Sequence, residues 1–318
     1  MHAARLHEIG GALRVEEIDD PVPAAGQVMV DIAYASVNPL DIWITRGAPG
    51  AAAANLPWIP GTEASGHVDG EPVLVRGGGL GVMRPGLYRE RAAVDRSTIH
   101  AIPAGVDLPQ AAGMPVIGVT AWHSVHTCAQ VTADDRVLVL GASGGVGSMV
   151  VQLAVAEGAT VWGQTGTTAN VAVIAEDGAA EVLVTDAAGL ADAASAYAPT
   201  VVFDPLGGEF PDRVIAAMAD RGRLVVYGTS ADPTVTLNWR QMYRKAIHII
   251  GYSGLIGTPE SGARVLGELF AAMEAQRLRV RLADVLPLAQ AAEAHAMLLE
   301  RRAGGKLVLD CRARAAGG

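Results

Sequence analysis

Hydrophobic and polar positions follow two different patterns along the chain, with a change near Met114. Before that point, short alternating or apolar runs at residues 27–34, 72–76 and 89–94 are separated by Gly and Pro. Alternation with a period of two is typical of half-buried strands, and helical spacing is almost absent from this part. The first third of the chain therefore predicts a compact, mostly β unit.

From Met114 onward, apolar strand-like runs alternate with helical stretches. We expect strands at residues 137–140, 160–163, 181–184, 201–203, 223–227 and 248–251, and helices at 146–157, 169–177 and 210–219. Strands that are apolar on both faces and alternate with helices are typical of a parallel sheet covered by helices. Two amphipathic helices, at 261–275 and 289–301, and a last strand at 306–310 complete the prediction. The predicted class is α/β, with a doubly wound parallel sheet beside the β-rich unit.

Composition and charge exclude several classes of function. A length of 318 residues suggests about two domains. The 24 Lys and Arg residues against 33 Asp and Glu residues give a net charge of −9 without a basic cluster, which argues against a nucleic-acid partner. The two cysteines, Cys128 and Cys311, cannot build a disulfide framework, so a reducing, cytoplasmic location is expected.

One uncharged stretch, residues 137–156, is long enough to span a membrane. Its centre reads Gly-Ala-Ser-Gly-Gly-Val-Gly-Ser, which favours a turn over a lipid-facing helix. We interpret it as a strand, a loop and a helix. The N-terminus has no apolar run behind its charges, so neither a secretory signal nor membrane association is expected.

The glycines of this stretch form a motif, Gly141-x-x-Gly144-x-x-Gly147, between a predicted strand and a predicted helix. Glycines there let backbone amides approach a pyrophosphate at the positive end of the helix. Alone, the motif is weak evidence, because the alternative is a tight strand-to-helix turn that binds nothing. Two further strands end in the glycine-containing segments 204–208 and 227–229, at the sheet edge where doubly wound folds bind ligands. The predicted dinucleotide-binding residues are Gly141, Ser143, Gly144, Gly145, Val146, Gly147, Tyr227, Gly228 and Thr229.

Collinear segments connect the chain to a known family. They lie at residues 35–41, 59–66, 86–90, 111–115, 120–123, 141–147 and 305–309. In these segments the chain resembles the medium-chain dehydrogenase/reductases, and among them the zinc-independent quinone oxidoreductase and enoyl reductase branch. The resemblance implies a β-rich GroES-like catalytic domain from residues 1–115 and 255–318, a Rossmann dinucleotide-binding domain from 116–254, and an active site in the cleft between them.

The resemblance also implies a homodimer, in which the last Rossmann strands of two copies pair edge to edge. Residues 248–252 read His-Ile-Ile-Gly-Tyr, an apolar strand with little to block an exposed edge.

The positions of zinc ligands distinguish the branches of this family. Zinc-dependent members need thiolate and imidazole ligands. Where they place a catalytic Cys this chain has Asn38, and where they place a ligand His it has Thr62. The residues after Gly66 also lack the cysteines of a structural zinc lobe. No metal site is therefore expected, and we interpret His67 and His123 as structural histidines.

Without a metal, the accessible chemistry is hydride transfer from a nicotinamide to an electrophilic carbon of a quinone or an enone. The resemblance implies that Asn38 contacts the nicotinamide region and that Asp41 and Thr120 line the same cleft. A carboxylate at Asp41 could equally stabilise the first turn of a helix. Trp43 stands where many relatives have a tyrosine, so the proton donor stays open. The predicted catalytic set is Asn38, Asp41, Trp43, Thr62 and Thr120.

The end of the predicted strand 160–163 bears on cofactor choice. NAD enzymes usually place an acid there, which would repel a 2′-phosphate. Residues 164–170 contain hydroxyl and amide groups and no acid, so NADPH is predicted, with NADH possible. The residues expected at this part of the cofactor are Thr165, Gly166, Thr167 and Asn170. Tyr252 and Lys306, in segments that the resemblance places around the cleft, complete the cofactor set.

The expected partner is a small molecule, a flat cyclic or conjugated carbonyl compound, because several aromatic residues fall near the cleft segments. The alternative is a catalytically silent dinucleotide-binding protein that senses redox state or acts structurally. Trp43 and Pro49 replace tyrosines of many relatives and keep this alternative open. Cofactor binding without turnover of any quinone or enone would indicate it.

Overall fold

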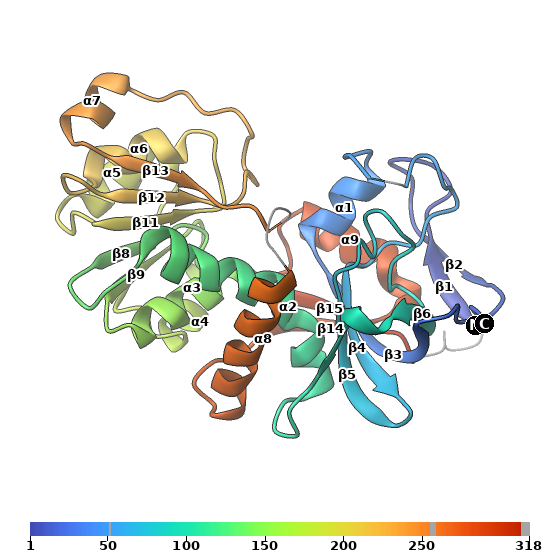
Figure 1. Cartoon of the computed structure of the whole chain (residues 1–318). Coiled ribbons are helices and arrows are strands. Elements are labelled where there is room, and N and C mark those ends of the chain that lie inside the picture. Colours follow the sequence, from blue (N-terminus) through green and yellow to red (C-terminus); the bar gives the residue numbers. More distant parts are fainter. Residues whose placement is uncertain (51, 255–258, 313–318) are drawn as a thin grey trace. The chain divides into compact units, whose positions relative to one another are not determined.

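Two compact units make up the chain in this computed structural model, which describes residues 1–50, 52–254 and 259–312 (Figure 1). Unit 1 comprises Met1–Val116 and Pro259–Gly318, and unit 2 comprises Ile117–Thr258. Unit 1 is therefore built from both ends of the chain. Its buried core contains Ala3 and Leu6 from the start of the chain together with Leu307 and Leu309 from near its end.

Unit 1 contains a seven-stranded sheet in the order β14-β15-β3-β4-β5-β7, with β6 paired to β3. Its strands are β3 (Gln27–Val37), β4 (Glu63–Val68), β5 (Glu71–Arg76), β6 (Arg91–Asp95), β7 (Ile99–Ala101), β14 (Leu282–Pro287) and β15 (Lys306–Asp310). The strands pair antiparallel except for β14 and β15. A separate pair is formed by β1 (His2–Arg5) and β2 (Arg14–Glu17). The pairing of Leu307 with Val37 joins the C-terminal strand to the first third of the chain.

The helices of unit 1 are α1 (Pro39–Thr45), α8 (Pro259–Glu274), α9 (Ala291–Leu299) and the first part of α2 (Leu108–Trp122). Short 3₁₀ turns lie at Arg96–Thr98 and Leu288–Gln290. The sequence pattern did not predict α2. This helix has no charged residue, so it lacks the polar face that makes helical periodicity visible.

Unit 2 contains a six-stranded parallel sheet in the order β10-β9-β8-β11-β12-β13. The strands are β8 (Arg136–Val139), β9 (Thr160–Thr165), β10 (Glu181–Val184), β11 (Val201–Asp204), β12 (Arg223–Val226) and β13 (His248–Gly251). Every adjacent pair is parallel. The predicted α/β class, with a doubly wound parallel sheet and a mostly β domain, is confirmed.

Helices lie on both faces of the unit 2 sheet, with α5 and α6 on one face and α3 and α4 on the other (Figure 1). The helices of this unit are α3 (Gly145–Ala156), α4 (Val171–Glu176), α5 (Ala187–Ser195), α6 (Phe210–Ala217) and α7 (Trp239–Arg244). A 3₁₀ turn, Thr168–Asn170, precedes α4, and a π-helix, His123–Ala129, follows α2. The hydrophobic pattern did not predict the short helices α5 and α7.

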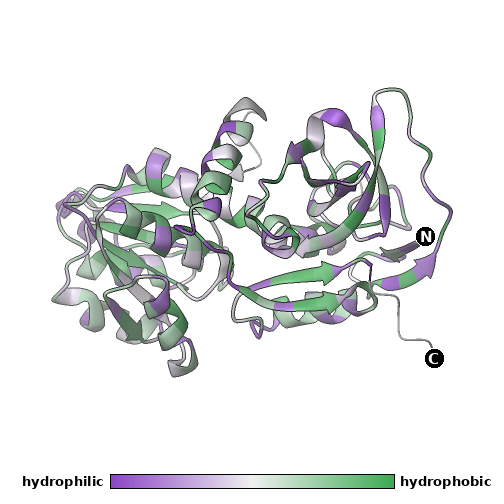
Figure 2. Cartoon of the chain, turned by 90° about the horizontal axis from the view of Figure 1, so that it is seen from below, coloured by the Kyte–Doolittle hydropathy of each residue, from purple (hydrophilic) through white to green (hydrophobic). Residues whose placement is uncertain are grey.

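The central strands of unit 2 consist mostly of buried apolar residues, and Figure 2 draws them largely in green. All residues of β11 are buried, whereas the edge strands β10 and β13 are partly exposed. The uncharged stretch 137–156 forms part of β8, the glycine turn and α3. Within the described ranges, no helix is long and apolar enough to cross a membrane.

Candidate functional site

The glycine turn between β8 and α3 is shaped by close backbone approach. Gly141 has a φ of +58°, and a Cβ on Gly147 would lie 2.5 Å from the Gly141 carbonyl oxygen. Only glycine fits at position 147 without moving the turn. Gly144 caps α3 without a side-chain hydrogen bond to the helix. The first amides of α3, at the positive end of the helix dipole, therefore offer donors to an anion.

Gln164, at the end of β9, holds the glycine turn in place. Its Oε1 accepts a hydrogen bond from the Gly141 amide at 3.1 Å, and its Nε2 donates to the Thr185 carbonyl oxygen at 2.5 Å. The side chain therefore links the carboxyl ends of three adjacent strands, β8, β9 and β10. Sequence analysis missed this role. The available signal was an amide placed at the end of an apolar strand next to the motif.

Asn170 joins the glycine turn to the segment after β9. Its Nδ2 donates to Ser143 Oγ at 3.0 Å and to Thr165 Oγ1 at 3.2 Å. The structure thus brings together three residues of the predicted cofactor set. Thr167 Oγ1 accepts from the Ala169 amide, and Gly166 is exposed. Hydroxyl and amide groups, with no acid between residues 164 and 170, make up this end of β9.

The ends of β11 and β12 meet at Asp204 and Tyr227. Asp204 is fully buried and accepts hydrogen bonds from the amides of Leu206 at 2.7 Å and Gly207 at 3.2 Å. Burial raises the pKa of Asp204 to about 6, although the two amides act in the opposite direction. The Tyr227 hydroxyl is buried without a hydrogen-bond partner in the described structure. Burial and the nearby Asp204 raise the pKa of Tyr227, so its hydroxyl stays protonated.

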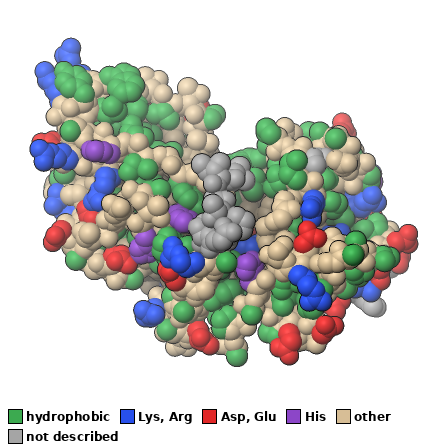
Figure 3. All heavy atoms as spheres, in the orientation of Figure 1, with side chains coloured by type: hydrophobic (Ala, Val, Ile, Leu, Met, Phe, Trp, Pro, Cys, Tyr) green, Lys and Arg blue, Asp and Glu red, His purple; other side chains and the backbone are tan. Residues whose placement is uncertain are grey.

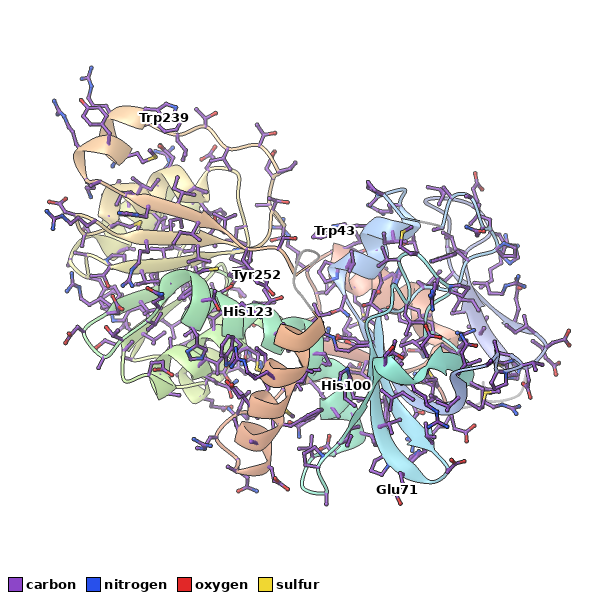
Figure 4. All side chains as sticks on the ribbon, viewed as in Figure 1. Trp43, Glu71, His100, His123, Trp239 and Tyr252 are labelled. Carbon is purple, nitrogen blue, oxygen red and sulfur yellow. The ribbon has the colours of Figure 1, made fainter. Side chains whose placement is uncertain are left out.

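The other predicted residues of unit 2 have varied surroundings. The Tyr252 ring stacks on His123, with ring centroids 5.6 Å apart and planes inclined by 20° (Figure 4). Gly228 lies against Pro205, because a Cβ there would be 2.9 Å from the Pro205 carbonyl oxygen. Thr229 is exposed, and Thr120 is half-buried on α2.

In unit 1, Asn38 is the centre of a buried polar cluster at the junction of β3 and α1. Its Nδ2 donates to Glu63 Oε1 at 2.9 Å and to Thr62 Oγ1 at 3.4 Å, and its Oδ1 accepts from Lys306 Nζ. All four side chains are buried. Because both polar atoms of its side chain are engaged, Asn38 acts here to fix the orientation of its three neighbours.

Lys306 and Glu63 form an ion pair inside this cluster, with Nζ 3.7 Å from Oε1. Lys306 Nζ also donates to the Val37 carbonyl oxygen, and Glu63 Oε2 accepts from the Val116 amide at 2.7 Å. Burial lowers the pKa of Lys306, and the Glu63 charge opposes that shift. Sequence analysis missed Glu63, although an acid within the mostly uncharged segment 59–66 was the signal available.

Asp41 lies in the first turn of α1, beside the same cluster. Its Oδ2 accepts hydrogen bonds from the backbone N–H of Asn38 at 2.8 Å and from the Tyr88 hydroxyl at 3.1 Å. Its Oδ1 is buried without a hydrogen-bond partner in the described residues. Burial raises the pKa of Asp41 to about 7, although the hydrogen bond from the backbone N–H of Asn38 and the charge of Lys306 act in the opposite direction. The carboxyl group thus both caps the helix and holds a proton near neutral pH.

His295 extends this polar region from α9. Its ring meets the Tyr88 ring edge to face, with centroids 5.8 Å apart, and its Nε2 is buried without a partner among the described residues. Burial lowers the pKa of His295 to about 4, and the charge of Arg46 acts in the same direction. The imidazole is therefore neutral at pH 7. Sequence analysis missed His295 and Tyr88.

Two predicted catalytic residues differ in their exposure. Trp43 is 49% exposed on α1 (Figure 4), whereas Thr62 is 9% exposed and can still donate its hydroxyl proton. In the part of the chain that the structure describes, no three His, Cys, Asp or Glu side chains are placed to hold a metal ion. On the face drawn in Figure 3, basic and acidic side chains are interspersed.

Taken as donor sets, the two units offer different chemistry. The start of α3, whose first amides are not capped by a side chain, fits the phosphates and ribose of a dinucleotide together with the hydroxyl and amide groups after β9. The cluster of unit 1 offers one ammonium, one hydroxyl and a carboxyl group that holds its proton near pH 7.

Comparison with known proteins gives consistent matches. Residues 24–104 match the family described as alcohol dehydrogenase GroES-like domain, and residues 178–309 match the family described as zinc-binding dehydrogenase. Human quinone oxidoreductase is 28% identical over 97% of each chain.

Two solved structures are similar over the whole chain. The quinone oxidoreductase of Thermus thermophilus, whose complex with NADPH is also known, is 26% identical with a TM-score of 0.84, covering 98% of this chain and 100% of that one. An NAD-dependent alcohol dehydrogenase is 27% identical with a TM-score of 0.86, covering 98% of this chain and 99% of the other.

Proposed function

Since the chain belongs to the medium-chain dehydrogenase/reductase superfamily, in its quinone oxidoreductase branch, and is an NAD(P)H-dependent oxidoreductase, we propose that it reduces quinones or α,β-unsaturated carbonyl compounds without a metal ion. One observation carries the proposal. Asn38 and Thr62, at the positions of zinc ligands in zinc-dependent relatives, are hydrogen-bonded to each other, and Asn38 also binds Glu63. An amide and a hydroxyl are poor zinc ligands. When bound, the nicotinamide supplies the hydride.

NADPH is the cofactor that unit 2 favours in this proposal. The segment after β9 carries no acid to repel a 2′-phosphate, and Asn170 orients the hydroxyls of Ser143 and Thr165. The known NADPH complex of the Thermus relative supports this choice. The contacts are made by neutral groups, which bind phosphate less strongly than a charged side chain would. We therefore expect preference for NADPH with measurable use of NADH.

The cluster of unit 1 has the groups that the substrate oxygen needs. Negative charge develops on this oxygen as the hydride arrives, and fixed donors stabilise it. We assign the donor role to the Thr62 hydroxyl, which would donate a hydrogen bond to the substrate oxygen. The positive charge of the Lys306 ammonium would add electrostatic stabilisation of that oxygen. Asn38 is a positioning residue because its side chain is fully engaged. Water supplies the proton that completes a hydroquinone or a saturated carbonyl product.

Purified protein should oxidise NADPH in the presence of at least one member of a panel of quinones and enones. Activity should survive dialysis against a strong chelator. Thr62→Val should lower kcat with little change in the KM for NADPH, whereas Thr45→Val, which also removes a buried hydroxyl, should retain kcat. NADPH binding without turnover of any acceptor would instead support the redox sensor or structural protein. Loss of activity with loss of stoichiometric zinc would contradict the metal-free mechanism.

We also propose a homodimer in the cytoplasm. The partly exposed edge strand β13 and two exposed aromatic side chains on α7, Tyr243 and Trp239, support the dimer. Trp239 is labelled in Figure 4. Both cysteines are free, which is in keeping with a reducing compartment.

A further inference from the structure

Arg89, two residues before β6, is a buried cation that has no counterion among the residues that the structure describes. The residue is 8% exposed, and its Nε has no hydrogen-bond partner in the described part of the chain. Within the described ranges, no carboxylate forms an ion pair with its guanidinium. Burial lowers the pKa of Arg89 to about 10, so the group is still charged at neutral pH. Arginine is almost never buried in this way unless it is paired, because desolvation of a charge is costly.

Arg89 lines a pocket of about 490 Å³ on unit 1. The pocket is also lined by apolar side chains, among them Pro21, Leu80 and Pro85. A pocket of this size that combines apolar side chains with a few polar and charged groups can hold a small organic ligand that has both characters.

The carboxylates around the pocket are already engaged. Asp95 is the one acid among the described lining residues. Its Oδ2 accepts a hydrogen bond from Arg84 Nη1 at 2.5 Å, and its Oδ1 accepts one from Gln27 Nε2 at 3.1 Å. Nearby, Asp20 pairs with Arg91 Nη1 at 2.6 Å. The lining therefore holds two guanidinium groups and one carboxylate, an excess of positive charge in a chain whose net charge is −9.

We propose that this pocket binds a small organic carboxylate, which pairs with Arg89 while its apolar body lies against Pro21, Leu80 and Pro85. A planar guanidinium can donate two parallel hydrogen bonds to a carboxylate. The ligand therefore supplies hydrogen-bond acceptors for Arg89, whose Nε has none among the described residues. The apolar wall favours a carboxylate with a hydrocarbon body over an inorganic anion, because only the former removes that wall from water. This site is separate in kind from the oxidoreductase function, since it needs neither NADPH nor an acceptor.

The test is calorimetric titration of the full chain with benzoate and octanoate, compared with inorganic phosphate and chloride at equal ionic strength. We expect saturable binding of at least one carboxylate and a matching rise in Tm. Arg89→Met should weaken that binding at least tenfold. Arg91→Met, which removes a nearby guanidinium already paired with Asp20, should leave it within twofold of the original. Ala93→Leu, with Arg89 retained, should block the pocket and also weaken binding.

Three results would overturn the proposal. The first is no saturable binding of either carboxylate beyond the chloride control. The second is an equal loss in Arg91→Met and Arg89→Met, which would indicate general charge attraction. The third is phosphate binding as tight as carboxylate binding, which would refute the role of the apolar wall. If Arg89→Met does not fold, the Ala93→Leu variant decides the matter, because full carboxylate affinity in that variant contradicts the location of the site.

Discussion

Lys306 Nζ lies 3.7 Å from Glu63 Oε1, and both side chains are almost completely buried. The two residues come from β15 and β4, which lie on either side of β3 in the unit 1 sheet. Asn38 contacts both of them, so one amide group orients both charges. This ion pair connects the last strand of the chain to its first third and places two opposite charges in the interior of unit 1.

Lys306→Met should destabilise the protein strongly, because it leaves the Glu63 carboxylate buried without its counterion. Loss of one partner from a buried pair typically costs about 3–5 kcal/mol. The exposed pair between Arg213 and Glu209 is the control, and Arg213→Ala should cost less than about 0.5 kcal/mol. Urea unfolding measures both changes. Equal free energies of unfolding for the two variants would contradict the importance of the buried pair.

Asp41 should make stability depend on pH between about 4 and 7. Burial raises the pKa of Asp41 to about 7 in the folded protein, from an ordinary value of 3.8, so the folded state holds the proton more tightly. The protonated carboxyl contributes stability that is fully present below the pKa of the unfolded state, 3.8, and is lost as pH rises through the pKa of the folded state, about 7. The contribution is at most about 4 kcal/mol, from about 1.4 kcal/mol for each pH unit.

Asp41→Asn should remove that slope, because an amide does not titrate in this range. The measurement is the free energy of unfolding at several pH values, taken as the difference between wild type and variant. Asp134→Asn, a change of an exposed aspartate in a turn of unit 2, is the matched control and should leave the slope as it is. A slope that persists in Asp41→Asn would show that another group causes it.

Gly147→Ala should weaken NADPH binding at least tenfold, because the new Cβ would lie 2.5 Å from the Gly141 carbonyl oxygen and displace the turn. Gly267→Ala on α8 is the control, since a Cβ there has no atom within 4 Å. It should raise stability by about 0.5–1 kcal/mol, as alanine does in a helix interior. Fluorescence titration with NADPH and thermal unfolding test both variants. Unchanged NADPH affinity in Gly147→Ala would place the cofactor elsewhere.

Thr165→Asp should shift preference from NADPH toward NADH, because a carboxylate at this position repels the 2′-phosphate. We expect the ratio of kcat/KM for NADPH to that for NADH to fall at least tenfold. Thr165→Asn has a similar shape without the charge and should change the ratio little. An equal fall in both variants would mean that the hydrogen bond from Asn170, and not charge repulsion, determines cofactor choice.

Ile249→Lys should produce a monomer if two copies pair through β13. Ile249 is 42% exposed on this edge strand, and a lysine on an exposed edge opposes pairing with the edge of a second copy. Val184 on β10, the opposite edge of the same sheet, is also 42% exposed, so Val184→Lys is the matched control. Light scattering at micromolar concentration should show a dimer for wild type and Val184→Lys. A monomeric wild type would refute the proposed dimer.

Local patterns were sufficient to predict the parallel sheet. The bounds of β10, Glu181–Val184, and of β13, His248–Gly251, agree with the prediction, because a short, mostly apolar run between turn residues is typical of a strand. The glycine motif was equally local, since its spacing reflects one turn and the start of one helix. Helix α2 was missed because it has no polar face to make its periodicity visible.

The sequence by itself determined the α/β class, the glycine turn and the absence of an acid after β9, since each depends on residues close together in the chain. Only the tertiary structure decided which polar groups meet. Lys306 and Asn38 are 268 residues apart, and nothing in their local sequence states that they share a hydrogen bond. The same holds for the guanidinium of Arg89, because its burial, and the absence of a counterion for it among the described residues, arise from packing between segments far apart in the chain. Local sequence specifies backbone conformation, whereas the pairing and desolvation of charges depend on contacts that only the folded chain makes.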